Sequence, residues 1–284
     1  MNKFKEKLNH YSELVMFKHS VFALPFIFIA MLVADQGWFG WRLLLLGTLA
    51  AVTARNFAMG VNRYLDRDVD ILNPRTKGRP SVDGRVSNAQ MVGFILSNAL
   101  LFIVVSYFVN ALAFQLSIPI LAVLGAYTFF KRFSAFAHLI LGISLGLAPI
   151  AGVVAVNGEI TLWSVVLAIG VMFWVAGFDL LYSLQDMAFD KANDLHSIPS
   201  KFGANKTMWI ARVFHFLTIV FWTYFVYLSG LGFWARLAVF FSAIMLSYEH
   251  IIVNKDFRKI DKAFFTVNGY LGFVFLILII VEVA

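Results

Sequence analysis

The sequence predicts an all-α, polytopic membrane protein with nine transmembrane helices. Of its 284 residues, 61% are hydrophobic and only 14% are charged, whereas about 25% of the residues of a soluble domain are charged. Apolar stretches of roughly 15 to 20 residues recur along the chain, and each is close to the length with which a helix crosses a bilayer. The lack of cysteine in the sequence excludes disulfides, thiolate metal sites and cysteine nucleophiles.

The predicted elements begin with an amphipathic surface helix. Residues 1–18 are polar, and no clear small-residue cleavage site follows the next apolar run. This segment is therefore expected to stay on the protein at the cytoplasmic surface rather than act as a signal peptide. The apolar stretches that predict the nine spans are residues 21–34, 43–61, 91–109, 111–130, 138–156, 160–181, 210–229, 232–247 and 263–283. We expect a single integral-membrane domain over residues 1–284.

The basic residues predict how these helices are oriented. If the amino terminus is cytoplasmic, 20 of the 23 Lys and Arg residues lie in cytoplasmic segments, Arg42 and Arg236 lie outside, and Arg55 lies within a span. Cytoplasmic loops are enriched in Lys and Arg, so we expect a multi-pass membrane protein with its amino terminus in the cytoplasm. The net charge of +7 is interpreted as this orientation signal, and no nucleic-acid partner is expected.

Two acidic clusters lie at the predicted cytoplasmic ends of helices 43–61 and 160–181. The clusters contain Asp66, Asp68, Asp70 and Asp83, and then Asp179, Asp186, Asp190 and Asp194. In the first cluster, Asn62, Asp66 and Asp70 recur every four residues, so their oxygens lie along one face of a helix. In the second, Asp186 and Asp190 lie about two and three helical turns after Asp179, so the three share a face in the same way.

Oxygen ligands grouped in this way suit Mg²⁺, which binds a few carboxylates and completes its shell with water and substrate phosphate. The same loops carry interleaved cations, namely Arg63, Arg67, Arg75, Lys77, Arg79, Lys191, Lys201 and Lys206. Carboxylates mixed with Arg and Lys predict a metal-bridged diphosphate site. Charged loops more commonly form solvated surfaces with weak ion pairs, but two clusters at matching helix ends favour the site.

The two acidic loops carry a faint internal repeat. In each, two aspartates four residues apart are followed by a proline and a glycine that are also four residues apart. These residues are Asp66, Asp70, Pro80 and Gly84 and, 120 residues after the first of them, Asp186, Asp190, Pro199 and Gly203. The repeat predicts that the two loops face each other across one site.

Other polar residues in or near the spans have simpler interpretations. An unpaired charge within a span costs at least ~2.5 kcal/mol, so Arg55 either packs or snorkels toward the cytoplasmic surface or has a functional partner. His138, His215 and His250 have no partner at ligand spacing and are interpreted as ordinary interfacial histidines. Most of the 31 Phe residues are expected to face lipid or the core, and a minority to line a substrate channel.

Four segments of the chain resemble the motifs of one known family. Residues 62–70, NRYLDRDVD, resemble a first Asp-rich motif, usually written NDxxDxxxD, and residues 179–190 resemble a second, which is close to DxxYSxQDxxxD. Residues 127–132 are similar to a YxxxKR segment, and residues 146–149 to a GxxP segment in helix five. These are the motifs of the UbiA superfamily of intramembrane prenyltransferases. The resemblance covers most of the chain and implies the nine-helix fold of that family, and we expect the protein in the inner membrane of a bacterium.

Two positions depart from the family pattern. Arg63 stands where the first motif often has a second aspartate, so a diphosphate contact is expected there rather than a metal contact. His196 stands before Ser197, where the family often has a basic residue, and this change is expected to weaken or pH-tune one phosphate contact.

The resemblance implies Mg²⁺-dependent transfer of a polyprenyl group from a polyprenyl diphosphate to an aromatic acid of the 4-hydroxybenzoate type, in quinone biosynthesis. It implies that the metal ligands are Asn62, Asp66, Asp70, Asp186 and Asp190, and that the diphosphate is bound by Arg63, Arg67, Arg79, Lys131, Arg132 and Lys201. Arg55, about two turns inside the membrane from Asn62, is the candidate for the acceptor's carboxylate. Asp179 or Tyr182 either orients the acceptor or relays its proton.

Alternatives remain open at this level. The tail segments 248–250 and 263–269 resemble the branch labelled 4-hydroxybenzoate polyprenyltransferase, and this branch includes enzymes of menaquinone synthesis that would use 1,4-dihydroxy-6-naphthoate. Transfer to haem or to a chlorophyll precursor is disfavoured by that tail. A membrane transporter of an anionic metabolite would also have many spans and a basic cytoplasmic face, but it predicts charges deep in several spans, whereas only Arg55 lies deep here.

Overall fold

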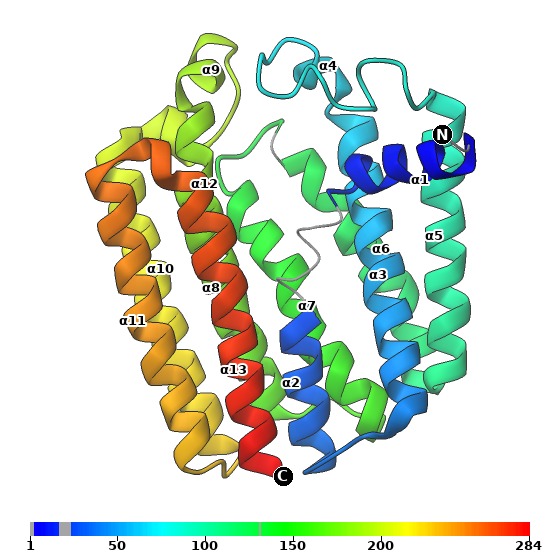
Figure 1. Cartoon of the computed structure of the whole chain (residues 1–284), viewed down its shortest axis with the longest axis vertical. Coiled ribbons are helices and arrows are strands. Elements are labelled where there is room, and N and C mark those ends of the chain that lie inside the picture. The colour runs from blue at the N-terminus through cyan, green and yellow to red at the C-terminus, as the bar shows by residue number, and fades with distance from the viewer. Residues whose placement is uncertain (1–2, 17–23, 131) are drawn as a thin grey trace.

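The computed structural model describes residues 3–16, 24–130 and 132–284, and this part of the chain is a bundle of long helices without strands (Figure 1). The helices are α1 (Lys3–Leu14), α2 (Leu24–Asp35), α3 (Gly40–Leu65), α4 (Arg67–Asp70), α5 (Asn88–Val109), α6 (Ala111–Phe130), α7 (Ala137–Asn157), α8 (Leu162–Ser183), α9 (Met187–Ala192), α10 (Ile198–Leu228), α11 (Phe233–Lys255), α12 (Ile260–Lys262) and α13 (Asn268–Val283). A π-helical turn, Ala263–Val267, joins α12 to α13.

Eight of the described helical segments are long and apolar enough to cross a membrane, and the apolar α2 is a shorter ninth. Each predicted span therefore corresponds to a helix, and the all-α membrane fold is confirmed. The start of the first predicted span, residues 21–23, lies outside the described residues.

Several helix boundaries differ from the prediction, and the two largest differences arise where polar residues continue a helix beyond its apolar run. The helix expected at residues 210–229 begins at Ile198, where Ser197 forms a capping box with Ser200. The helix expected to end at residue 247 continues to Lys255, because Glu249 is buried and bonded to a neighbouring helix. The last predicted span starts as a π turn rather than as an α-helix.

An aromatic core joins four helices of the bundle. The Phe26 ring of α2 lies 5.0 Å from Trp174 of α8 and 5.1 Å from Trp222 of α10, measured between ring centroids. Phe275 of α13 lies 5.2 Å from Trp222. These rings are fully buried, and a helix that is apolar all round, like α2, is expected in such a core.

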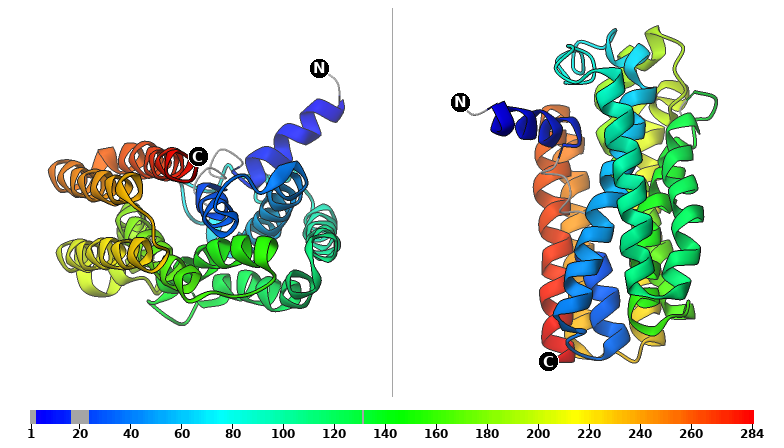
Figure 2. Two further views of the ribbon diagram at one scale, coloured as in Figure 1. Left: turned by 90° about the horizontal axis from the view of Figure 1, so that it is seen from below. Right: turned by 90° about the vertical axis from the view of Figure 1, so that its right-hand side faces the viewer.

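The α1 helix lies across the bundle axis at the end that carries α4 and α9 (Figure 2). Main-chain oxygens at its end and just after it accept hydrogen bonds from two arginines of α3: Arg55 donates to Val15 and Met16, and Arg63 donates to Leu14. The amino-terminal segment and both acidic loops thus share one end of the bundle, as the charge pattern predicts. Which membrane face this end occupies stays a prediction.

Candidate active site

The two acidic loops face each other and are bonded across the gap between them. The side-chain amide of Asn73 donates to Oδ1 of Asp186 at 3.2 Å, and Nε of Arg75 donates to the same oxygen at 3.0 Å. The repeat extends to the backbone, because Gly84 and Gly203 have φ of 87° and 79°, a conformation that glycine adopts at little cost. The prediction that the loops meet at one site is therefore confirmed.

The first acidic loop presents a buried row of oxygens. Asn62 donates to Oδ2 of Asp66 at 2.9 Å, and Nη1 of Arg79 lies 2.6 and 2.7 Å from the two carboxylate oxygens of Asp70. The spacing predicts one continuous helix, but α3 ends at Leu65 and Asp70 belongs to α4. All three predicted oxygen ligands nevertheless line one chamber.

The second loop presents Asp186 and Asp190 to the same chamber. Arg75 holds Asp186 through two of its nitrogens, and the Ser197 hydroxyl donates to Oδ2 of Asp190 at 2.8 Å. Arginine therefore pairs with Asp70 of the first loop and with Asp186 of the second, so each loop has a neutralising cation beside its acids.

No three His, Asp or Glu side chains converge into a ready metal cage within the described ranges. The donor chemistry still fits magnesium, because Mg²⁺ is usually held by one or two carboxylates while substrate phosphates and waters complete its octahedron. Carboxylates from two loops of one chamber can supply that many ligands without forming a cage.

The polar chamber has a volume of about 310 Å³ and brings together most of the predicted site. The predicted residues that line it are Asn62, Arg63, Asp66, Asp70, Arg79, Arg132, Asp179, Tyr182, Asp186 and Asp190. Sequence reasoning gave Arg75 no specific role and missed Asn73, and no local signal marks either, because both act on a carboxylate more than 100 residues away.

Three predicted residues lie elsewhere in the described part of the chain. Arg67 bonds the side chain of Asn88 on α5. Lys201 lines a neighbouring surface pocket, which shares Asp190, Leu195 and His196 with the polar chamber. Arg55 lies in the wall of a second, apolar chamber. Lys131 lies outside the described residues.

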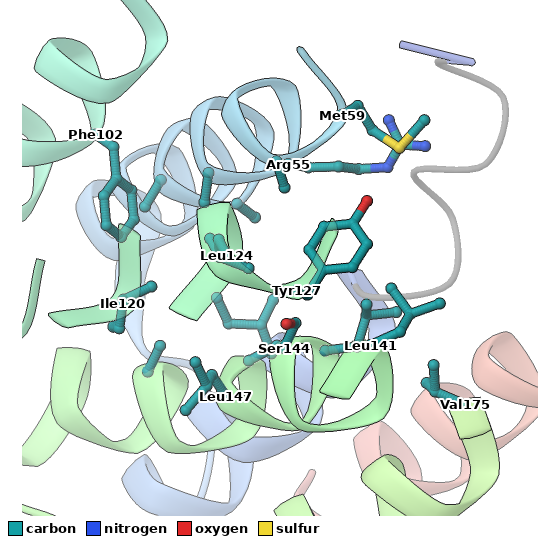
Figure 3. Close-up of a pocket in the computed structure, with 18 of the residues that line it drawn as sticks. Arg55, Met59, Phe102, Ile120, Leu124, Tyr127, Leu141, Ser144, Leu147 and Val175 are labelled. Carbon is teal, nitrogen blue, oxygen red and sulfur yellow. The ribbon is translucent and has the colours of Figure 1, made fainter. Parts of the chain in front are cut away.

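The apolar chamber adjoins the polar one. Its volume is about 260 Å³, and the two chambers share five lining residues, which are Met59, Tyr127, Leu141, Asp179 and Phe264. Alanines of α3 and α7 leave the space open, and Phe102, Ile120, Leu124 and Leu147 are among the apolar side chains around it (Figure 3). A molecule with a charged head and an apolar tail could occupy both chambers at once.

Arg55 has partners that the prediction did not foresee. Its guanidinium donates to the main-chain oxygens of Val15 at 2.8 Å and Met16 at 3.1 Å. The packing interpretation is thus the one realised in this structure, while the role toward an acceptor carboxylate stays a prediction. Arg63 is similarly occupied, since it donates to Leu14, to the Met16 sulfur at 2.9 Å and to Asn62 at 3.4 Å.

The three histidines that were interpreted as ordinary interfacial residues each have a hydrogen-bond partner on another helix. Nδ1 of His138 lies 2.7 Å from Oδ2 of Asp179, and Nδ1 of His215 lies 3.0 Å from Nε2 of His250. Spacing could not predict these pairs, because the partners come from other helices, 41 and 35 residues along the chain.

Ion pairs fix the charges of the loop residues. Hydrogen bonds from Arg132 lower the pKa of the Asp68 carboxyl. Burial lowers the pKa of Arg75, but the hydrogen bond and the charge of Asp186 outweigh burial, so that the pKa rises above its ordinary value. Arg75 is therefore a cation at neutral pH, as binding of a diphosphate requires.

A charged chamber that opens onto an apolar one, within helices of membrane length, characterises a membrane enzyme for substrates with a charged head and an apolar tail. The model of the UbiA prenyltransferase family matches residues 23–278, and the chain belongs to that family.

Relatives agree with this assignment over most of the chain. The 4-hydroxybenzoate octaprenyltransferase of Herminiimonas arsenicoxydans is 28% identical over 247 residues, which are 86% of this chain and 85% of the relative. The apo structure of a UbiA homolog from Aeropyrum pernix K1 has a TM-score of 0.85 and 28% identity, over 94% of this chain and 98% of that one. A UbiA homolog from Archaeoglobus fulgidus, solved with GPP and Mg²⁺, has a TM-score of 0.78 at 18% identity and covers 96% of this chain and 99% of its own.

Proposed function

We propose that this protein transfers a polyprenyl group from a polyprenyl diphosphate to an aromatic acid of the 4-hydroxybenzoate type, with Mg²⁺, as a step of quinone biosynthesis at the cytoplasmic face of a bacterial inner membrane. The observation that carries the proposal is the contact of the two chambers, one lined by carboxylates and arginines and the other by apolar side chains. The names of relatives such as the enzyme from Herminiimonas arsenicoxydans support the benzoate acceptor.

The polar chamber would bind the diphosphate of the donor. Arg63, Arg75, Arg79 and Arg132 line it, and the planar guanidinium group binds phosphate oxygens through two parallel hydrogen bonds. The hydroxyl of Tyr182 accepts a hydrogen bond from Arg75 at 3.2 Å, so Tyr182 would orient this arginine toward the diphosphate.

The carboxylates of both loops would hold the metal. Asn62, Asp66 and Asp70 on one side and Asp186 and Asp190 on the other are its candidate ligands. When bound, Mg²⁺ neutralises charge on the diphosphate and makes it a better leaving group. Arg75 and Arg79 neutralise Asp186 and the buried Asp70 in this structure, which stabilises acids that would otherwise repel one another.

The junction of the chambers would hold the reacting carbon of the prenyl group. As the bond to the diphosphate breaks, positive charge develops on the allylic group, and aromatic faces stabilise a cation nearby. Tyr127 and Phe264 line both chambers at this point. The apolar wall excludes water that would otherwise capture the cation, and the ring carbon ortho to the acceptor's hydroxyl forms the new bond.

Product detection by mass spectrometry tests the proposal. Purified protein would be supplied with Mg²⁺, geranyl diphosphate and either 4-hydroxybenzoate or 1,4-dihydroxy-6-naphthoate, with the Asp66→Asn variant as a background control. Prenylated benzoate is expected. A product from the naphthoate alone would replace the benzoate acceptor, and no product above the Asp66→Asn background from either acceptor would overturn the proposal.

A further inference from the structure

A carboxylate and an imidazole form a dyad beside the junction of the two chambers. We propose that Asp179 takes the proton that the aromatic ring loses and that His138 is the positioning residue that holds its carboxylate. This inference rests on the proposed function and names the proton acceptor that its reaction needs.

The carboxylate of the dyad is the part that faces the chambers. Asp179, in the last turns of α8, lines both chambers, whereas His138, the second residue of α7, lines only the polar one in the described structure. The side chain of Asp179 is 22% exposed and that of His138 is 9% exposed. The imidazole therefore lies behind the carboxylate, as seen from the place where the prenyl carbon would react.

The hydrogen bond between them determines the tautomer of the imidazole. Nδ1 of His138 lies 2.7 Å from Oδ2 of Asp179, and a carboxylate only accepts hydrogen bonds, so Nδ1 carries the proton. Nε2 is buried without a hydrogen-bond partner in the described part of the chain. The other tautomer, with the proton on Nε2, would leave a buried N–H without a hydrogen-bond acceptor. It would also turn the Nδ1 lone pair toward the carboxylate, and both changes are unfavourable.

This arrangement leaves the other carboxylate oxygen for the substrate. Oδ2 of Asp179 is fixed by His138, and Oδ1 accepts no hydrogen bond from the residues that the structure describes. A general base needs such a fixed orientation within reach of the proton that it removes. Tyr182, the other candidate, is a weaker one, because its hydroxyl already bonds Arg75 and it belongs to the polar chamber only, so far as the wall is described.

Prenyl transfer breaks a C–O bond of the donor and a C–H bond of the acceptor ring, and it forms one C–C bond. The bond between the first prenyl carbon and the diphosphate oxygen breaks, and its electron pair leaves with the diphosphate. The ring carbon ortho to the hydroxyl donates an electron pair to that prenyl carbon and forms the new C–C bond. The same ring carbon then loses its proton to Oδ1 of Asp179, and the electron pair of the broken C–H bond restores aromaticity. The Nδ1–H of His138 stays bonded to Oδ2 throughout, and water in the polar chamber later removes the proton.

The test compares Asp179→Asn, His138→Leu and His138→Asn with the wild-type enzyme. An asparagine at position 138 can still donate a hydrogen bond to Asp179, whereas leucine cannot. Asp35→Asn, at the exposed end of α2, is the matched control for loss of a carboxylate. Each protein would be assayed with geranyl diphosphate and Mg²⁺, in separate reactions with ordinary 4-hydroxybenzoate and with 4-hydroxybenzoate deuterated at both carbons ortho to the hydroxyl.

We expect Asp179→Asn to lose about 10²- to 10⁴-fold in turnover, the contribution typical of a general base. Proton loss should become rate-limiting in this variant, so that the deuterated acceptor reacts more slowly, while the wild-type enzyme uses both acceptors at nearly equal rates. His138→Leu should show the same isotope discrimination, and His138→Asn should recover part of the rate. A residue that only supports the fold would not introduce an isotope effect.

The outcomes separate this inference from the proposed function. Wild-type turnover in Asp179→Asn, or a slow variant that uses both acceptors equally, would overturn the dyad while prenyl transfer stands. Should His138→Leu fail to fold, judged by its thermal unfolding midpoint, Asp179→Asn still decides the matter. If the wild-type protein forms no prenylated acceptor, the proposed function is overturned and the role of the dyad with it.

Discussion

Nη1 of Arg55, inside α3, donates a hydrogen bond to the main-chain oxygen of Val15 at 2.8 Å. A charged group within the bundle thereby fastens the segment that follows α1, and Met16 of the same segment lines the polar chamber. Hydrogen bonds from charged donors contribute about 1.5 to 3 kcal/mol each to stability. The two bonds from Arg55 are therefore expected to hold the amino-terminal segment in place as part of the chamber wall.

Replacement of Arg55 by Gln should release α1. We expect limited proteolysis to cleave near residues 3–16 faster in Arg55→Gln than in the wild-type protein, because the main-chain oxygens of Val15 and Met16 lose a cationic donor. The comparison includes KM for 4-hydroxybenzoate and for its methyl ester. Unchanged cleavage together with a KM that rises for the acid alone would contradict the fastening role and support the predicted contact with the acceptor carboxylate.

Loss of Arg79 should destabilise the protein by leaving Asp70 unpaired. The side chain of Asp70 is 8% exposed and that of Arg79 is 22% exposed. Arg79→Met is therefore expected to lower the free energy of unfolding by about 3 kcal/mol, the low end for a buried pair. The double variant Asp70→Asn/Arg79→Met should recover much of the unfolding midpoint but not the turnover.

The pair Arg85–Glu13 is the matched control for that experiment. Its side chains are 33% and 51% exposed, and exposed ion pairs contribute at most about 1 kcal/mol. Arg85→Met should therefore shift the midpoint less than Arg79→Met does. Equal shifts in the two variants would be evidence against burial as the cause.

Glu282 should stabilise the start of α11. Its carboxylate accepts hydrogen bonds from the main-chain nitrogens of Gly232, Trp234 and Ala235 at 2.5, 2.7 and 3.1 Å, and such caps contribute about 0.5 to 2 kcal/mol. We expect a lower unfolding midpoint for Glu282→Ala, a smaller decrease for Glu282→Gln, and turnover close to wild type at low temperature. A midpoint that does not change in Glu282→Ala would show that the cap adds nothing.

A larger side chain in the apolar chamber should shorten the preferred donor. Ala54 lines this chamber. Its replacement by Leu adds bulk to the chamber wall, and overpacking of this kind typically costs about 1 to 3 kcal/mol. We expect kcat/KM in Ala54→Leu to fall more for farnesyl diphosphate than for dimethylallyl diphosphate. The control Val104→Leu adds a methylene at an exposed position of α5. Equal losses for both donors would place the prenyl tail elsewhere.

The spans and the acidic loops could be predicted because their signals are local. The length of an apolar stretch identifies a span without knowledge of its neighbours, and the spacing of the aspartates was enough to predict the two acidic loops. The early start of α10 also had a local signal, since Ser197 and Pro199 are typical of a helix start. The apolar run used to predict that helix begins only after the kink at Gly203.

The partners of the polar residues could not be predicted, because they depend on how distant helices pack. His138 and Asp179 are 41 residues apart, and Arg75 and Asp186 are 111 apart. Nothing in the sequence around Glu249 reveals that it bonds Asn268, whose side chain also accepts from Trp174. Each of these bonds exists only once two or three helices have assembled.

The cap on α11 also constrains the order of events during synthesis. The carboxylate of Glu282 follows Gly232 by 50 residues, so a ribosome needs about 3 to 10 s to supply it after the first residues of α11. For that interval the amide groups at the start of α11 must be satisfied by water or by lipid headgroups. The helix can therefore enter the membrane early but acquires its final partner only when α13 has been inserted beside it.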